Sequence, residues 1–177
     1  PTGHVNFDGH EYLGQFAGAY LVFGSPDGLM LIDQHAAHER IMLERLKATS
    51  AKRVASQPLL VPEVVTVTPA QIALLEAALP LLDELGLEME IYGRDSVALK
   101  AVPACLPHIP AQEIVADLAD QLRDGISSQP LEERKEKIMA LLACRAAVKA
   151  RSALLPEKVA SLVGELAATP LNSHCPH

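Results

Sequence analysis

The sequence is short of positive charge and of large aromatic side chains. Its 177 residues contain 15 Lys and Arg against 22 Asp and Glu, so the formal net charge is -7. Because phosphate binding needs clustered Lys and Arg, this balance argues against a free-standing nucleic-acid binder. There is no tryptophan, and the aromatic residues are three Phe and three Tyr. We therefore expect most of the core to consist of Leu, Val, Ile and Ala.

Long apolar runs are also missing. None approaches the roughly 20 residues that span a bilayer, which argues against a membrane protein. With 49% hydrophobic and 21% charged residues, the chain is too apolar for intrinsic disorder. Its length suits one domain or two small ones. The sequence begins with neither Met nor a basic-then-apolar leader, so we expect a piece of something longer.

The cysteines form no recognisable framework. There are three, Cys105, Cys144 and Cys175, and no two form a Cys-x-x-Cys pair. An odd number of widely spaced thiols argues against a disulfide framework and favours a reducing compartment such as the cytoplasm. The thiols are then available as metal ligands.

The first fifty residues indicate strands followed by a helix. Three short apolar or aromatic runs predict strands over 11–16, 19–23 and 29–32. Ser25-Pro26-Asp27-Gly28 is a strong hairpin signal, whereas the break at Ala17-Gly18 fits a hairpin or one bulged strand. The spacing of the apolar residues then changes to a helical period and predicts a helix over 34–48, with Asp33 as its cap.

The remainder predicts an α+β fold. Residues 51–137 indicate a β-α-β-β-α order: a strand over 59–68, a helix from Thr68-Pro69 to Gly86, a hairpin of 87–92 with 96–102, and a helix from Pro110 to near Gly125. Pro80 is expected to kink or split the first of these helices. The polar stretch 127–137 fits a linker or the start of a helix. Further helices are predicted from Ile138 and over 157–167.

Asp33, His35 and Glu39 are the first candidate site. His35 and Glu39 are four residues apart, so on a helix they share a face and can bind one metal ion, with Asp33 close by. The alternative is ordinary: Asp33 is a helix cap, and the other two form a solvated pair.

Cys175 and His177 are a second group of candidate ligands, and Cys144 lies apart from them in a helix of small residues. Pro176 holds its neighbours extended, so Cys175 and His177 face the same side and can reach one ion. Zinc accepts thiolate, imidazole and carboxylate together. The alternatives are a frayed terminus for Cys175 and His177 and a core thiol for Cys144.

Three motifs occur in order: Asp33-Gln34-His35-Ala36-x-x-Glu39-x-x-x-x-Glu44, Ala143-Cys144-Arg145 and Cys175-Pro176-His177. Together they resemble the signature motifs of the endonuclease-type C-terminal domain of MutL, a DNA mismatch repair protein. The resemblance covers essentially the whole chain. The family's last motif continues with Gly-Arg-Pro, whereas this sequence stops at His177, so we expect the metal ligands to be kept and cutting to be weak.

The resemblance implies a metal-dependent nuclease that nicks duplex DNA by phosphodiester hydrolysis. Asp33 and Glu39 would be catalytic, and the metal ligands would be His35, Glu39, Cys144, Cys175 and His177. Zn²⁺ would be regulatory or structural, and Mn²⁺ or Mg²⁺ catalytic. Glu44 and Arg145 belong to the motifs without an assigned role. The implied organisation is a dimerisation domain of 1–50 and 138–177 with the metal site, and an inserted regulatory domain of 51–137.

A further motif, Gln57-Pro58-Leu59-Leu60-Val61-Pro62, resembles the Gln-x-x-Leu-x-Pro peptide with which this family docks to the replicative sliding clamp. In an extended segment Gln57 would make polar anchors, while Leu60 and Pro62 fill an apolar pocket. The alternative is a linker that enters an edge strand and is punctuated by proline.

The implied partners are a second copy of the chain, the sliding clamp, an N-terminal ATPase half, a mismatch-recognition protein and duplex DNA. The implied location is the cytoplasm, at the bacterial nucleoid when working. The charge is uneven, with 8 basic and 14 acidic residues in 51–137 but 4 and 2 in 138–177. We therefore expect weak DNA binding by this chain alone. The competing hypotheses are a non-catalytic homodimerisation module with structural zinc and an unrelated zinc hydrolase.

Overall fold

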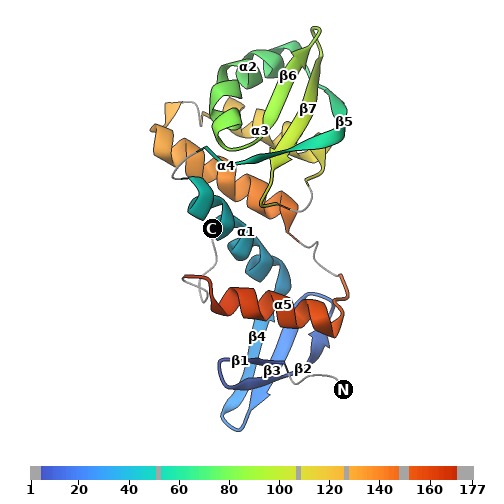
Figure 1. Cartoon of the computed structure of the whole chain (residues 1–177), viewed down its shortest axis with the longest axis vertical. Coiled ribbons are helices and arrows are strands. Elements are labelled where there is room, and N and C mark those ends of the chain that lie inside the picture. Colours follow the sequence, from blue (N-terminus) through green and yellow to red (C-terminus); the bar gives the residue numbers. More distant parts are fainter. Residues whose placement is uncertain (1–4, 51–52, 107–108, 126–127, 148–151, 171–177) are drawn as a thin grey trace. The chain divides into compact units, whose positions relative to one another are not determined.

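The computed structural model describes residues 5–50, 53–106, 109–125, 128–147 and 152–170. The chain forms two compact units: unit 1 lies within 1–44 and 147–177, and unit 2 spans 45–146. Each unit has an antiparallel sheet together with helices (Figure 1), so the predicted α+β class is confirmed. The roles predicted for the two regions, dimerisation and regulation, stay predictions.

The sheet of unit 1 is a meander in the order β1-β2-β3-β4. Its strands are β1 (Asn6–Phe7), β2 (His10–Phe16), β3 (Tyr20–Ser25) and β4 (Gly28–Asp33). The Ser25–Gly28 hairpin is present as predicted. The open question at Ala17-Gly18 is answered by φ angles of 52° and 64°, because two successive positive φ values make the tight turn that hairpins prefer. A separate register shift lies between Tyr12 and Gly14.

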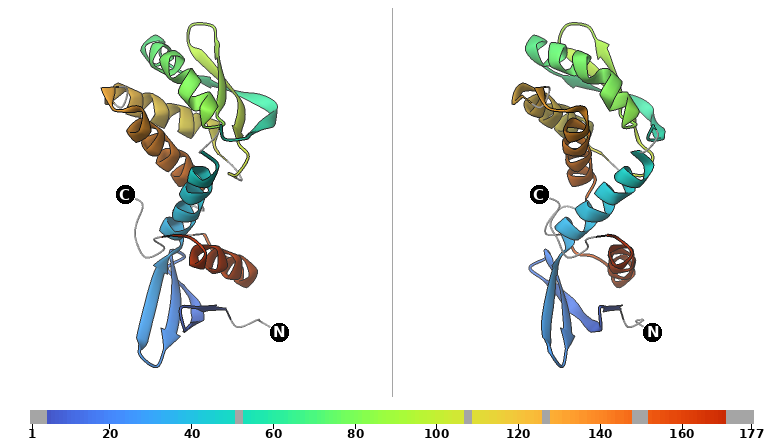
Figure 2. Two further views of the ribbon diagram at one scale, coloured as in Figure 1. Left: turned by 60° about the vertical axis from the view of Figure 1, so that its left-hand side comes forward. Right: turned by 90° about the vertical axis from the view of Figure 1, so that its left-hand side faces the viewer.

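The two faces of this sheet differ. Leu21 and Phe23 on β3 are fully buried, and the Phe23 ring lies 5.4 Å from that of Tyr12 and 6.1 Å from that of Phe7. The helix α5 (Pro156–Ala167) lies beside the sheet (Figure 2) and buries Val159, Leu162, Val163 and Leu166. The α5 helix and these aromatic contacts form the interior of unit 1.

The opposite face, called here the apolar sheet face, is exposed. Strand register puts Phe16 opposite Tyr20, Val22 opposite Leu31 and Gly24 opposite Leu29, all on this side. A Cβ on Gly24 would lie 2.8 Å from Leu13 Cδ1, so Leu13 covers the glycine. The large exposed residues of the face are Leu13, Phe16, Tyr20, Leu29 and Leu31.

The helix α1 (Gln34–Ser50) follows β4 without a loop. Its residues up to Glu44 belong to unit 1, and those from Arg45 belong to unit 2.

Unit 2 has a three-stranded sheet in the order β5-β7-β6. The strands are β5 (Ser56–Thr66), β6 (Glu88–Tyr92) and β7 (Ser96–Pro103), and the helices are α2 (Pro69–Glu84), α3 (Ala111–Arg123) and α4 (Leu131–Ala146). From β5 to α3 the elements follow the predicted β-α-β-β-α order. The α2 helix contacts β6 and α3, and α3 contacts β5 and α4. Leu75, Leu82, Leu99, Ile114 and Leu118 are among the fully buried residues of this core.

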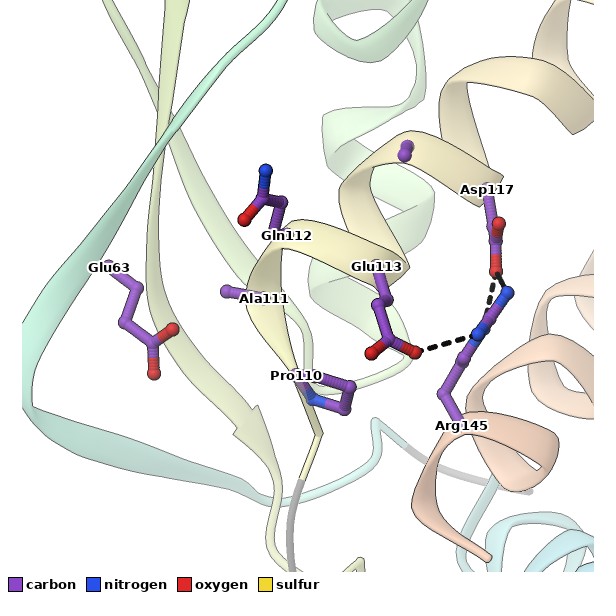
Figure 3. Close-up of a pocket in the computed structure, with 8 residues that line it drawn as sticks. Glu63, Pro110, Ala111, Gln112, Glu113, Asp117 and Arg145 are labelled. Carbon is purple, nitrogen blue, oxygen red and sulfur yellow. Dashed lines mark hydrogen bonds and ion pairs between the residues drawn. The ribbon is translucent and has the colours of Figure 1, made fainter. Parts of the chain in front are cut away.

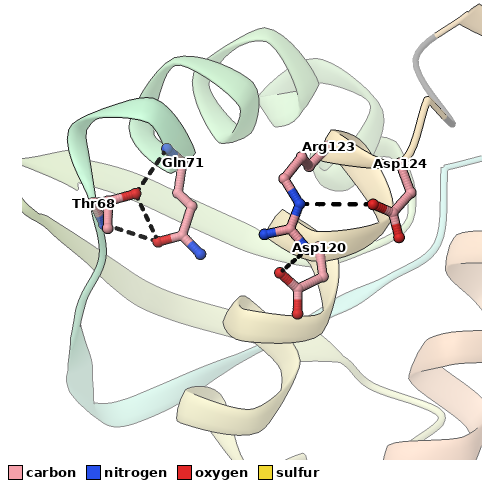
Figure 4. A network of polar contacts seen from close by, with 5 residues as sticks. All are labelled: Thr68, Gln71, Asp120, Arg123 and Asp124. Atoms are coloured by element: carbon pink, nitrogen blue, oxygen red, sulfur yellow. Dashed lines mark hydrogen bonds and ion pairs between the residues drawn. The ribbon is translucent and has the colours of Figure 1, made fainter.

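Local signals start and stop these helices. Thr68 caps α2, with a reciprocal bond from its backbone to the Gln71 side chain (Figure 4). The α2 helix continues through Pro80, which therefore does not split it. Pro80 and Glu76 are both exposed, so water can satisfy the carbonyl that lacks an N–H partner. The polar stretch before Ile138 is the start of α4.

None of the helices in the described part of the chain combines the length and the apolar character needed to cross a bilayer.

Candidate metal centre

Asp33 stands at the junction of β4 and α1 and caps the helix, as predicted. Its Oδ1 accepts hydrogen bonds from the backbone N–H groups of His35 (2.8 Å) and Ala36 (3.0 Å). The helix N-terminus favours this negative charge. The carboxylate is exposed, so the same group that fixes the helix start also faces solvent at the site.

His35 and Glu39 lie on one face of α1, one turn apart. His35 Nε2 is 3.8 Å from Glu39 Oε2, and Glu39 is only 2% exposed. Burial of a carboxylate is costly unless a positive group or hydrogen bonds compensate for it. An imidazole nitrogen and a buried carboxylate oxygen this close fit the donor set of a divalent ion such as zinc. The pair thus offers two possible metal donors on a single helix.

Gln34, which the motif contains without an obvious role, is fully buried and holds the start of α1 in unit 1. Its Nε2 donates to the carbonyl oxygens of Gly18 (2.7 Å) and Ser152 (2.9 Å), and its Oε1 accepts from Gln15 Nε2 (2.5 Å). Gln15 Oε1 in turn accepts from the backbone N–H of Leu154 (2.9 Å). Sequence reasoning missed this network because its partners are up to 139 residues apart.

Arg40 and Glu44 form a second local contact on α1. Arg40 Nη2 lies 3.0 Å from Glu44 Oε1 and donates to the carbonyl oxygen of Pro170 at 3.3 Å. Glu44, the last acidic residue of the first motif, therefore pairs with an arginine rather than projecting alone. The bond to Pro170 joins α1 to the residues just after α5.

The other predicted ligands belong to other parts of the chain. Cys144 lies in the last turn of α4, in unit 2, where it is half-buried and not in a disulfide. Its neighbour Arg145 is paired with Glu113 and Asp117 on α3. Cys175 and His177 lie outside the described residues.

The predicted clamp motif lies on β5, which is an edge strand. Pro58 pairs with Ala101 and Glu63 with Leu99, so residues 59–62 stand opposite Lys100 alone and bulge from the ladder. Leu60 is 105% exposed, and Gln57 and Pro62 are exposed as well. The segment is therefore extended, edge-located and accessible.

The chain is thus an α+β protein with an exposed apolar sheet face and a His–Glu pair on a capped helix. The family described as "MutL C terminal dimerisation domain" matches residues 13–154. This chain belongs to that family.

Curated relatives agree over almost the whole chain. The DNA mismatch repair protein MutL of Syntrophus aciditrophicus (strain SB) is 41% identical over 175 residues, covering 98% of this chain and 28% of that protein. MutL of Anaeromyxobacter dehalogenans (strain 2CP-C) is 40% identical over 179 residues, covering 100% and 29%. MutL of Methanoculleus marisnigri is 38% identical over 169 residues, covering 94% and 28%. The chain thus spans less than a third of the length of these relatives.

Proposed function

We propose that this chain is the nicking and dimerisation part of a mismatch repair protein and that it hydrolyses one phosphodiester bond of duplex DNA. The observation that carries the proposal is the paired His35 and buried Glu39 one turn after the exposed capping carboxylate of Asp33. A divalent ion bound there would supply a water of lowered pKa and would offset charge on the leaving oxygen.

The proposed ligands are His35, Glu39, Cys144, Cys175 and His177. Among the described residues, His35 and Glu39 lie on α1 in unit 1, and Cys144 lies on α4 in unit 2. An imidazole, a carboxylate and a thiolate suit Zn²⁺, whereas the Asp33 carboxylate with water suits Mn²⁺ or Mg²⁺. Asp33 and Glu39 are the proposed catalytic residues, because their carboxylates would lie next to the bound ion and the DNA phosphate. Asp33 also fixes the position of the His35 backbone.

The test is nicking of supercoiled plasmid with Mn²⁺, using the chain restored to its full-length protein. We expect Asp33→Asn to reduce nicking by at least about 100-fold, since a preorganised charged group at a reacting centre is worth that much. Asparagine remains a good helix cap, so α1 should stay intact. The matched control is Asp27→Asn, in the exposed turn between β3 and β4 of the same unit, which should cut normally. Normal nicking by Asp33→Asn would contradict the catalytic assignment.

Metal content is a separate test. Protein purified without added zinc should contain zinc that is reduced in His35→Ala. The control His10→Ala removes a half-exposed histidine of β2 that bonds to a backbone oxygen instead. A wild-type chain that binds no divalent metal at any concentration would exclude the proposed cluster.

We propose that the homodimer forms through the apolar sheet face. Five large apolar side chains on one face of a small sheet are more than a lone soluble unit usually exposes together. A second copy can cover the face isologously, each sheet packing against the other. The family's description as a dimerisation domain supports this choice of partner.

We also propose that the segment Gln57–Pro62 docks to the sliding clamp. Its support is the bulge from the β5 edge, which leaves Leu60 outside the ladder and the core. Leu60→Ala should weaken binding to immobilised clamp by about 10-fold or more, as expected for an apolar anchor in a pocket. Val64→Ala is the control, because Val64 is exposed on the same strand but paired with Ala98 and outside the motif. Equal losses in both variants would contradict the proposal.

The remaining partners follow from the family. The ATPase half, the mismatch-recognition protein and DNA are proposed to act with the whole protein, and DNA binding by this acidic chain alone is expected to be weak. The alternative is a homodimerisation module with structural zinc. It predicts zinc binding in the wild type with nicking that is absent in the full-length protein.

A further inference from the structure

Arg145, in the second motif, pairs with two acidic residues of another helix. It lies in the last turn of α4, directly after Cys144. Its Nη1 donates to Glu113 Oε2 at 2.8 Å, and its Nη2 pairs with Asp117 Oδ2 (Figure 3). Glu113 and Asp117 are one turn apart on α3, so one guanidinium bridges two carboxylates on the same helical face. The contact ties the end of one helix to the first half of another.

The geometry leaves the arginine poorly suited to bind DNA. Its single positive charge faces two negative charges, so the trio carries a net charge of -1 and does not attract phosphate. The side chain is 33% exposed, and the carboxylates occupy the donor groups that a phosphate would need. Burial disfavours the charged form, but the bonds to Asp117 and Glu113 outweigh it and raise the pKa of Arg145. The guanidinium is thus held in place by two carboxylates.

The arrangement also suits both helix ends. A cation in the last turn of α4 and Glu113 in the first turn of α3 each complement the local helix dipole. Ala143 and Ala146, on either side of Cys144 and Arg145, are buried, so apolar packing alone holds this turn only through small side chains. Alanine contributes little buried area, so the ion pairs add to the packing of Leu142, which is fully buried just before this turn.

We infer that Arg145 is a positioning residue that clamps the last turn of α4 to α3 and so fixes where the Cys144 thiolate is presented to the metal. The inference rests on the proposed function, in which Cys144 is a ligand. It assigns the arginine of the Ala143-Cys144-Arg145 motif to the support of a ligand and not to DNA. Outer groups that orient metal ligands typically change metal affinity by about 10- to 100-fold when removed.

The test uses the same chain with Arg145→Gln and Arg145→Lys. Zinc affinity is measured by competition with a chelator, and Co²⁺ is used as a spectroscopic probe of thiolate coordination. Arg145→Gln should weaken zinc binding by about 10- to 100-fold and diminish the thiolate-to-Co²⁺ charge-transfer band. Arg145→Lys keeps the charge but loses the two-pronged geometry, so its effect should be intermediate.

Arg123 provides a matched control. It also pairs with two acidic residues, Asp120 and Asp124, but both are neighbours at the end of α3, and the contact joins no second helix (Figure 4). Arg123→Gln should leave zinc affinity and the Co²⁺ spectrum unchanged. Circular dichroism identifies a variant that has lost its helices. If Arg145→Gln loses them, the zinc affinity of Arg145→Lys tests the positioning role instead.

The outcomes separate this inference from the proposed function. If the wild type binds no metal, or binds Co²⁺ without a thiolate band, the proposed site fails. If the wild type shows the thiolate band and both Arg145 variants keep its intensity and the zinc affinity, only the positioning role is overturned. Weaker DNA binding with normal metal binding in Arg145→Gln would likewise overturn it and identify a phosphate contact.

Discussion

The two units differ most in what they bury. Within the described residues, the buried polar or charged side chains are Gln34, Glu39 and Arg40, all on the part of α1 that belongs to unit 1. The buried side chains described in unit 2 are apolar. Burying polar groups costs stability unless each is paired, and here Gln34 bonds to the carbonyls of Gly18 and Ser152 while Arg40 pairs with Glu44. The first signature motif, Asp33 to Glu44, therefore lies where the described interior is most polar.

The units also differ in what they expose. Unit 1 exposes five large apolar side chains on one sheet face, whereas unit 2 exposes apolar side chains mainly along the bulged edge of β5, at Leu60, Val61 and Val64. A broad face suits a folded partner, and a narrow extended edge suits docking as a peptide. Unit 1 is therefore expected to depend on a partner more than unit 2 does.

The largest expected effect concerns the apolar sheet face. Leu31→Glu should raise the dimer dissociation constant by about 1,000-fold, because a two-fold interface loses the leucine twice, at about 2 kcal/mol each. Analytical ultracentrifugation over a concentration series measures it. The control is Leu155→Glu, which is 69% exposed in unit 1 but off the sheet. If Leu31→Glu stays dimeric, the partner is on another surface.

A smaller effect is expected in the apolar core of unit 2. Leu118→Ala on α3 should lower the free energy of unfolding by about 2–5 kcal/mol, since the fully buried leucine leaves a cavity. Urea unfolding followed by helical circular dichroism measures this loss. Leu131→Ala, at a half-exposed leucine that begins α4, should change stability much less. Dimer affinity should be unaffected, and its loss would show that the units are not independent in this respect.

Gln34→Ala tests the polar interior of unit 1. Its removal leaves the carbonyls of Gly18 and Ser152 without their donor, which should cost about 1–3 kcal/mol. In a Tyr92→Phe background, tyrosine emission reports only unit 1, because Tyr12 and Tyr20 are then the remaining tyrosines. Gln112→Ala, at an exposed position of α3, is the control. Equal unfolding midpoints in the two variants would show that the network contributes nothing.

The smallest effect is expected at alkaline pH in unit 2. Burial raises the pKa of the Cys105 thiol above its ordinary value of 9.0, and this outweighs the hydrogen bond with Thr49 that lowers it. The folded state thus holds the thiol proton more tightly than the unfolded state. The resulting stability is complete below about pH 9 and is lost as pH rises through the raised value. Urea unfolding at about pH 8 and pH 10 should show a smaller loss in Cys105→Ala than in the wild type, and equal losses would contradict this.

Local chemistry made several features predictable. Asp33 caps α1, Thr68 and Gln71 cap α2, and the Ser25–Gly28 turn closes a hairpin, because each of these uses residues within four positions of one another. His35 and Glu39 were placed together by helical spacing alone. The α+β class followed from the order of such elements.

The contacts that support the motifs were not predictable in the same way. Gln34 gave no signal of burial, because glutamine is normally exposed and its partners come from β2, a turn and the segment at Ser152. Arg145 had no assigned role in its motif, whereas Glu113 and Asp117 pair with it from a different helix. Glu44 likewise had no role until Arg40 was seen beside it.

The sequence alone determined the class of fold, the helix that carries Asp33, His35 and Glu39, and the family to which the chain belongs, since spacing along a helix and motif order are written in adjacent residues. Only the tertiary structure decided that Gln34 is an internal anchor, that Arg145 is neutralised, and that one sheet face is left apolar. The physical reason is the range of the contacts: hydrogen bonds, ion pairs and burial depend on which distant segments meet, and no local period encodes that meeting.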